Sequence, residues 1–174
     1  MPTYPRTRPR LRFTRDDAQR AWETWRFNCG PASLCAVLDM TPDEIRPHLL
    51  DFERKGFTNP TLMASILHKL RVQFRQVYRA DGPPEDYPEP PLGLMRVQWV
   101  GPWCQPGVPF AARYRQTHWV GVAGGEVFDV NAMCAGGWLT FREWSKELVP
   151  WLIREAVPRG NGEWWPTHIL EVLH

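Results

Sequence analysis

The spacing of hydrophobic residues changes along the chain from a helical period to a strand period. In residues 59–70, "NPTLMASILHKL", the apolar residues recur every three or four positions and share one helical face. These residues are Leu62, Met63, Ile66, Leu67 and Leu70. Residues 72–79 and 94–100 instead show the alternation and residue types of strands, and residues 167–174 are expected to form a last strand. Helices followed by strands indicate the α+β fold class.

Threonine residues mark the starts of several predicted helices. Thr14 is the expected N-cap of the first helix, because its hydroxyl can accept from a free N–H of the first turn. Thr41 and Thr140 each precede a glutamate by three positions, Glu44 and Glu143, which completes a capping box. We therefore expect helices to begin directly after these threonines.

A β-hairpin is predicted where two apolar strand segments flank Gly124 and Gly125, in "THWVGVAGGEVFDVNA". With a two-residue turn at these glycines, the numbers of paired residues sum to 249. This register places His118 opposite Asn131 and makes Asp129 its diagonal neighbour. Because side chains alternate along a strand, the three residues are expected on one face of the hairpin.

The chain of 174 residues has the length and composition of one globular domain, with 43% hydrophobic and 23% charged residues. We assign residues 14–174 to a single domain and residues 1–13 to a flexible basic arm, since the opening stretch is rich in arginine. The arm is expected to be solvated or, alternatively, to contact an acidic partner. A net charge of only +2 disfavours nucleic acid as a partner.

The start of the chain has no apolar stretch of signal-peptide length, and no segment approaches a membrane span. We therefore expect a cytoplasmic protein with reduced cysteines, either acting there or delivered from the cell as an effector. The sequence contains no CxxC and no HxxxH motif, so neither a metal nor a cofactor is expected. Cys35 and Cys134 are expected to be buried structural thiols, whereas Cys104 lies in a proline-rich loop.

Cys29 stands in "NCGPASL", where we expect a helix over residues 29–38 with Pro31 in its first turn. Three roles are open to this thiol: a buried structural group, a metal ligand or a nucleophile. The absence of paired metal ligands removes the second role. A helix N-terminus stabilises a thiolate, and Gly30 lets a substrate approach the backbone closely. A histidine beside an acid or an amide, as expected for His118, is what a cysteine nucleophile needs.

The ordered segments "NCGPASLCAVL", "HWVGV" and "VFDVNA" resemble the papain-like cysteine peptidases. The likeness is greatest to the bacteriocin-processing (double-glycine leader) peptidases and their free-standing bacterial and phage relatives, and residues 40–117 carry no match. The resemblance implies a papain-like fold with N-terminal helices packed on an antiparallel sheet. It implies that Cys29 is the nucleophile, His118 the general base and acid, and Asp129 the orienting residue. Asn131 is the alternative third residue, because papain has asparagine in that role.

The function implied by this resemblance is hydrolysis of a peptide or isopeptide amide in a peptide or protein substrate, through a thioester on Cys29. The same triad also serves deamidation and transglutaminase-type acyl transfer. The family usually has a glutamine six residues before the nucleophile, but this chain has Glu23, whose carboxylate would repel an oxyanion. Gln19 and Asn28 are the alternative amides. Glu23 therefore leaves open a catalytically degenerate binding module.

Overall fold

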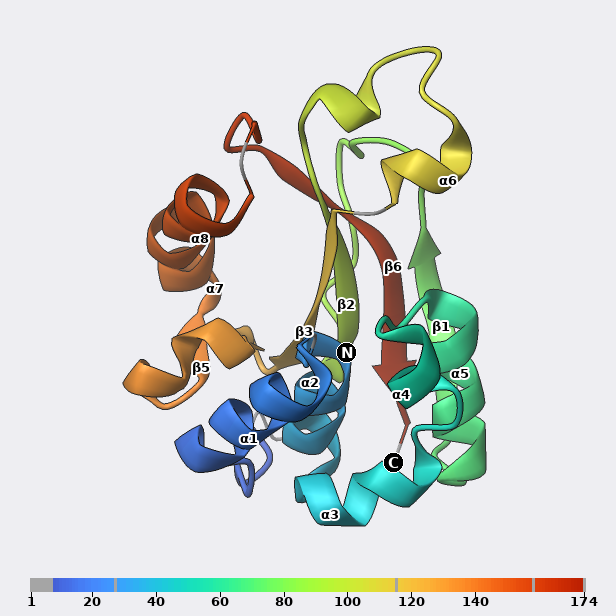
Figure 1. The fold of residues 1–174 in the computed structure, drawn as a ribbon, viewed down its shortest axis with the longest axis vertical. Helices are drawn as coiled ribbons and strands as arrows, with labels where there is room; N and C mark the ends of the chain where they lie inside the picture. The colour runs from blue at the N-terminus through green and yellow to red at the C-terminus, as the bar shows by residue number, and fades with distance from the viewer. Residues whose placement is uncertain (1–7, 27, 115, 158, 174) are drawn as a thin grey trace, which may run out of the picture.

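The computed structural model describes residues 8–26, 28–114, 116–157 and 159–173 (Figure 1). Its α-helices are α1 (Arg15–Trp25), α2 (Cys29–Leu38), α3 (Pro42–Ile45), α4 (Phe52–Lys55), α5 (Pro60–Lys69), α6 (Phe110–Arg113), α7 (Phe141–Glu143) and α8 (Val149–Ala156). Short 3-10 turns are η1 (Arg46–His48), η2 (Pro102–Cys104) and η3 (Val130–Ala135), and η4 (Trp144–Leu148) is a π-helical turn. The strands are β1 (Phe74–Arg79), β2 (Leu92–Trp99), β3 (Thr117–Ala123), β4 (Glu126–Phe128), β5 (Trp138–Thr140) and β6 (Trp164–Val172).

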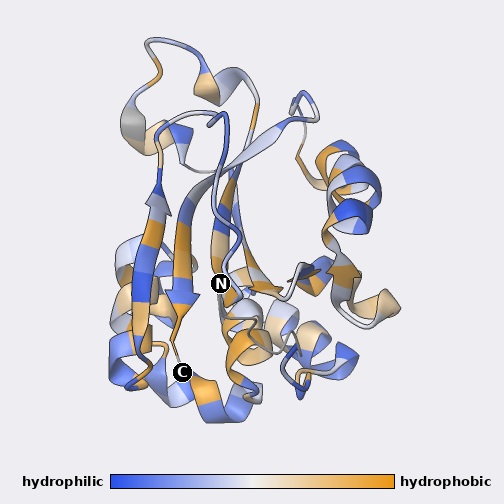
Figure 2. Ribbon diagram, turned by 180° about the vertical axis from the view of Figure 1, so that it is seen from behind, coloured by the Kyte–Doolittle hydropathy of each residue, from blue (hydrophilic) through white to orange (hydrophobic). Residues whose placement is uncertain are grey.

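The strands form one six-stranded sheet in the order β1-β6-β2-β3-β4-β5, and every neighbouring pair is antiparallel. The predicted α+β class with helices before an antiparallel sheet is therefore confirmed. In Figure 1, α7 and α8 lie on the opposite side of the strands from α4 and α5. The central strands carry hydrophobic stretches between these helices, while the helices themselves carry both hydrophilic and hydrophobic residues (Figure 2).

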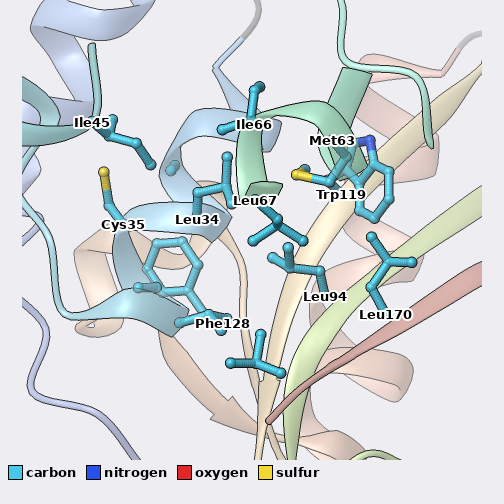
Figure 3. Close-up of a cluster of buried hydrophobic side chains, with 14 of the residues drawn as sticks. Leu34, Cys35, Ile45, Met63, Ile66, Leu67, Leu94, Trp119, Phe128 and Leu170 are labelled. Carbon is cyan, nitrogen blue, oxygen red and sulfur yellow. The ribbon is translucent and has the colours of Figure 1, made fainter. Parts of the chain in front are cut away.

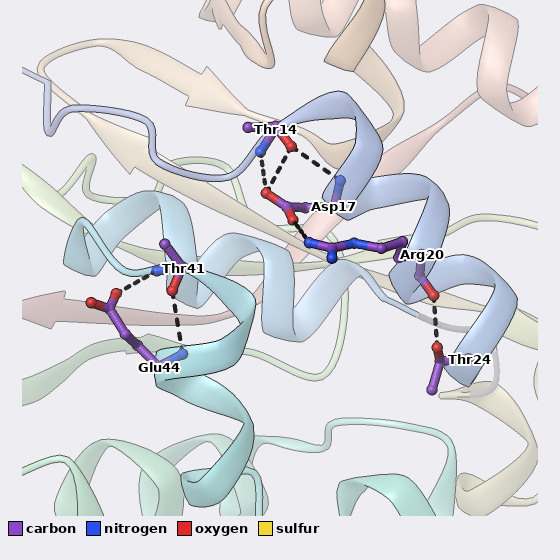
Figure 4. A network of polar contacts seen from close by, with 6 residues as sticks. All are labelled: Thr14, Asp17, Arg20, Thr24, Thr41 and Glu44. Atoms are coloured by element: carbon purple, nitrogen blue, oxygen red, sulfur yellow. Dashed lines mark hydrogen bonds and ion pairs between the residues drawn. The ribbon is translucent and has the colours of Figure 1, made fainter.

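The predicted helix starts are confirmed by their capping contacts. The Thr14 hydroxyl accepts a hydrogen bond from the N–H of Asp17, and the Asp17 carboxylate accepts from the Thr14 N–H at 2.8 Å (Figure 4). Thr41 and Glu44 make the same reciprocal contacts at the start of α3 (Figure 4). The Thr140 capping box also forms, at the start of α7. These contacts satisfy N–H groups that a helix N-terminus leaves without an intrahelical partner.

Two clusters of buried hydrophobic residues lie on the two faces of the sheet. Helices α2 and α5 cover one face, where Leu34 and Ile66 pack with Leu94, Trp119 and other side chains (Figure 3). The second cluster joins strand residues of the other face to η4 and α8; it includes Val97, Val120, Trp144, Val149 and Ile153. Because each layer of helices buries one face, the central strands β2 and β3 are buried along almost their whole length.

Several elements differ from the sequence-based expectation. The late helix is divided into α7, η4 and α8, because Pro150 has no N–H to bond the carbonyl of Lys146 and the turn before it widens. The last strand begins at Trp164, where it pairs with Trp99, and not at residue 167. The expectation that Cys134 is buried is wrong: it lies exposed in η3, a two-turn 3-10 helix whose buried residues are Val130 and Ala132.

The described part of the N-terminal segment lies along the domain. Arg8 pairs with Glu126 and Arg12 with Glu44, both at the surface. Phe13 is buried and contacts the ring of Phe128 edge-on, and Leu11 also packs against this core, so packing begins before Thr14. Residues 1–7 of the predicted basic arm lie outside the described residues. Within the described part of the chain, no helix combines the length and apolar character needed to cross a membrane.

Candidate active site

Cys29 is the first residue of α2 and is partly exposed, whereas the seven residues after Gly30 are almost entirely buried. Asn28 is the N-cap residue, and its side chain makes no capping hydrogen bond. Gly30 packs against Thr58, and a Cβ atom added to this glycine would lie 2.4 Å from the Thr58 hydroxyl oxygen. The glycine therefore lets the start of α2 lie directly against the loop that precedes α5. Cys29 is held at the end of a fixed helix.

The N-terminal end of α2 occupies an edge of β3 that β4 leaves open. Strand β4 ends at Phe128, which pairs with Gly121, so Trp119 lies beyond the last paired residue. The backbone of Trp119 instead faces α2, where its carbonyl accepts a hydrogen bond from the Ser33 hydroxyl at 3.0 Å. Its backbone also hydrogen-bonds Cys29. This packing brings the thiol beside His118, the residue before Trp119.

His118 is buried and its Nε2 lies 3.0 Å from Oδ2 of Asp129. The same Oδ2 accepts from Nε1 of Trp144 at 2.9 Å, and Oδ1 accepts from the backbone N–H and the side-chain amide of Asn131. Asp129 is fully buried, and these four hydrogen bonds occupy both of its oxygens. A buried carboxylate with this many donors keeps its negative charge. His118 therefore lies between an anionic carboxylate and the Cys29 thiol.

The predicted hairpin register is confirmed where the strands pair, since Gly121–Phe128, Val122–Val127 and Ala123–Glu126 all sum to 249. The expected pairing of His118 with Asn131 is wrong. The chain leaves the strand after Phe128 and turns into η3, so Asn131 lies in a 3-10 helix and holds the carboxylate of Asp129. The register of a hairpin predicts residue pairs only as far as both strands continue. Here β4 has three residues and ends at Phe128, before Asn131.

The charges of this cluster shift the pKa values of its members. Burial alone would raise the pKa of Cys29, but the charge and hydrogen bond of His118 and the Trp119 backbone lower it below its ordinary value. Burial alone would lower the pKa of His118, but Asp129 and Cys29 raise it to about 10. The lowered pKa of Cys29 and the raised pKa of His118 both favour a thiolate beside an imidazolium. Because Nε2 of His118 contacts Asp129, Nδ1 is the nitrogen that remains for the thiol.

Two tryptophans outside the predicted set complete the surroundings of His118. Trp99 at the end of β2 stacks on the imidazole, with ring centroids 5.8 Å apart and planes inclined by 23°. Trp144 donates to Asp129 from η4. Both tryptophans are buried and exclude water from the histidine–aspartate pair. No local motif signals these roles, because Trp99 and Trp144 come from segments distant from the hairpin in sequence.

The three residues considered for the oxyanion site make other contacts. Gln19 donates from its amide to Glu23 at 2.7 Å, and both are exposed one turn apart on α1. The Asn28 amide donates to the backbone carbonyl of Ala18 at 3.1 Å and ties α1 to the start of α2. The carboxylate of Glu23 is thus bound by Gln19 at the surface. The backbone N–H of Cys29, at the helix N-terminus, is the remaining donor that the sequence suggests.

No cluster of three or more histidine, cysteine, aspartate or glutamate side chains suited to a metal occurs among the described residues. All four cysteines are free thiols. Compared with protein-family models, with curated proteins and with solved structures, the chain matches none. A function is therefore inferred from the geometry around Cys29.

Proposed function

We propose that this chain is a papain-like cysteine hydrolase, a peptidase or amidase that cleaves a peptide or isopeptide amide through a thioester on Cys29. One observation carries the proposal: a cysteine at a helix N-terminus contacts a buried histidine whose other nitrogen binds a buried, fully hydrogen-bonded aspartate. This is the chemical order of a nucleophile, a base and an orienting acid. The papain-like assignment is supported by the helical first part, the antiparallel sheet and the sequence order of these three residues.

In the first half of the proposed reaction, the Cys29 thiolate attacks the carbonyl carbon of the scissile amide. The negative charge that develops on the carbonyl oxygen lies near the N-terminus of α2, where the helix dipole and backbone N–H groups stabilise it. His118 then donates its proton to the leaving nitrogen as the carbon–nitrogen bond breaks. The products of this half are a free amine and a thioester on Cys29.

In the second half, neutral His118 takes a proton from water as the water oxygen attacks the thioester carbonyl. The carbon–sulfur bond breaks, the acid product leaves, and the thiolate and imidazolium are restored. Asp129 holds His118 in the orientation that both steps require and stabilises its positive charge. Replacing water by an amine gives transglutaminase-type transfer, and a side-chain amide substrate gives deamidation. No step requires a cofactor, and the expected setting is the cytosol.

Selective alkylation tests whether Cys29 is the activated thiol. Iodoacetamide reacts with thiolates, so at mildly acidic pH it is expected to label Cys29 before the other three cysteines. Burial raises the pKa of Cys35, which keeps that thiol protonated and unreactive. Peptide mapping by mass spectrometry after timed quenching gives the rate at each cysteine.

His118→Ala is the decisive variant, because it removes the imidazolium that lowers the pKa of Cys29. Selective labelling at mildly acidic pH is expected to disappear in it, while labelling of the exposed Cys134 stays unchanged and serves as an internal control. Equal, slow labelling of all four cysteines in the unaltered protein would contradict the catalytic proposal. It would favour a papain-like binding module without catalysis.

A further inference from the structure

A pocket of about 540 Å³ opens between the start of α5 and the strands β1, β6 and β2. Its volume is in the range of pockets that hold a small ligand or a few side chains. The polar side chains of its lining include Arg79, Asp81, Arg96, Tyr114 and His168. The triad does not use any of them. The pocket is therefore a separate feature whose role the proposed reaction leaves unexplained.

Arg96 is the unusual member of this lining, because a guanidinium is rarely buried without a carboxylate. Only 6% of the residue is exposed. Its donors reach neutral oxygens: the Thr117 hydroxyl at 3.1 Å, with the Tyr114 carbonyl and the Thr167 hydroxyl both at 3.5 Å. Its Nε is buried and has no partner. Among the described residues, no carboxylate forms an ion pair with Arg96.

Arg96 lies close to the proposed nucleophile. In the sheet it pairs directly with Trp119, the residue that follows His118 and whose backbone contacts Cys29. Side chains of directly paired residues lie on the same face of a sheet, about 5 Å apart at Cβ. The charges of Cys29 and Arg96 also interact. Arg96 therefore lies one strand away from the backbone that contacts Cys29, on the sheet face opposite the His118 side chain, and the pocket opens on that face.

The other charged groups of the pocket leave it positive. Arg79 is exposed at its rim, and Asp81 is the one acid among the described lining residues. Asp81 accepts a hydrogen bond from the Tyr114 hydroxyl at 2.9 Å. Burial, with the charges of Arg96 and Arg79, lowers the pKa of His168 to about 4, so this histidine is neutral near pH 7, and its Nδ1 is buried without a partner. The pocket thus holds two arginines against one aspartate and is positive.

From these observations we propose that the pocket binds a carboxylate of the substrate through Arg96, so that the enzyme selects an acidic side chain or a free C-terminus near the scissile amide. This inference rests on the proposed function of Cys29. A carboxylate matches the planar fork of a guanidinium and accepts two hydrogen bonds from it. It would also supply the counter-charge that the buried Arg96 lacks in the described chain.

The test is protection of Cys29 from iodoacetamide by short peptides in matched pairs. One arm compares acetyl-Ala-Glu-Ala amide with acetyl-Ala-Gln-Ala amide, which differ in one side-chain carboxylate. The other arm compares acetyl-Ala-Ala-Ala with a free C-terminus and the same peptide as an amide. In at least one arm, the carboxylate peptide is expected to protect at about tenfold lower concentration, the factor that one charge-assisted hydrogen bond supplies. The arm that shows the difference identifies the source of the carboxylate.

The variant Arg96→Met is expected to abolish this difference, because it keeps the length of the side chain and removes its charge. Arg96→Lys keeps the charge but loses the planar fork, so the difference in protection between carboxylate and neutral peptides is expected to shrink several-fold. This variant replaces Arg96→Met in the test if the methionine variant does not fold. Arg154→Met is the control: it removes an exposed arginine of α8, outside the pocket, and the difference is expected to persist.

The outcomes separate this inference from the proposed function. If Cys29 of the unaltered protein is labelled selectively but carboxylate and neutral peptides protect equally, the carboxylate subsite is wrong and the nucleophile stands. If both Arg96 variants keep the carboxylate preference, that preference comes from the imidazolium of His118. This result would also overturn the proposed carboxylate subsite at Arg96. If Cys29 of the unaltered protein is not labelled selectively, the proposed function itself is overturned.

Discussion

Asp129→Asn is the substitution that tests most directly how the charge of Asp129 acts on His118. The asparagine side chain has the same shape and nearly the same volume, but it carries no charge. In the structure Asp129 faces four donors, from His118, Trp144 and two groups of Asn131. An amide can accept on one side only, so its NH₂ group would meet donors on the other. The variant therefore weakens both the charge on His118 and the local hydrogen bonding.

The expected size follows from the contact that is changed. A hydrogen bond to a charged group contributes about 1.5–3 kcal/mol, and a neutral replacement about 1 kcal/mol. The loss is thus about 0.5–2 kcal/mol, which corresponds to about one unit in the pKa of His118 at 1.36 kcal/mol per unit. The pKa of His118 is raised by Asp129, so the substitution lowers it. At mildly acidic pH His118 stays protonated in both proteins, so the change is expected at alkaline pH, where the step in the alkylation rate that accompanies loss of the imidazolium moves down by about one pH unit.

The assay is the rate of Cys29 alkylation as a function of pH, measured by peptide mapping. Asn131→Ala is the matched comparison, because it keeps the carboxylate and removes one uncharged donor, whose hydrogen bond to Oδ1 is 2.8 Å long. It is expected to shift this pH profile less than Asp129→Asn does, since the carboxylate keeps its charge and the lost bond is present in both protonation states of His118. Thermal unfolding of both variants, followed by circular dichroism, separates loss of fold from loss of charge.

A larger effect of Asn131→Ala than of Asp129→Asn, with both variants folded, would refute the reasoning. It would mean that the asparagine and not the aspartate orients His118. An unchanged pH profile in Asp129→Asn would refute it as well, because the carboxylate would then not act on the histidine.

Two other substitutions test the supports of the site. Gly30→Ala places a Cβ atom 2.4 Å from the Thr58 hydroxyl oxygen, so the free energy of unfolding measured in urea is expected to fall by about 1–3 kcal/mol. Unchanged stability would show that the loop before α5 can move away without cost. Trp144→Phe keeps a buried ring but deletes its hydrogen bond to Asp129. It is expected to cost about 1.5–3 kcal/mol of stability, the contribution of a hydrogen bond to a charged group, and to shift the pH profile of Cys29 labelling less than Asp129→Asn does. A larger shift than in Asp129→Asn would assign the tryptophan a role beyond this bond.

Local signals in the sequence were sufficient for most of the helices. The Thr14 cap and the bounds of α2 depend on contacts within a few residues, so spacing and residue type alone indicate them. The hairpin register also follows from a local feature, the two-residue turn at Gly124 and Gly125. Short elements such as β5 were not predicted, because three residues are too few to show a period.

The site was predictable only in part, because it depends on contacts between segments that are far apart in the sequence. Residue types and their order pointed to Cys29, His118 and Asp129, but their contact depends on α2 packing at the open edge of β3. Where β4 ends decides that Asn131 serves Asp129 and does not face His118. That end is set by tertiary packing and leaves no mark in the alternation of residues.

By itself, the sequence determined the fold class, the helix that begins at Cys29 and the chemistry that its three candidate residues can perform. Only the tertiary structure decided which side chains surround them. Trp99 reaches the site from β2 and Trp144 from η4, two segments far apart in the chain. Periodicity and capping act between neighbours along the chain, whereas a site is made by contacts across it, and the energy of those contacts depends on a packing that no single segment specifies.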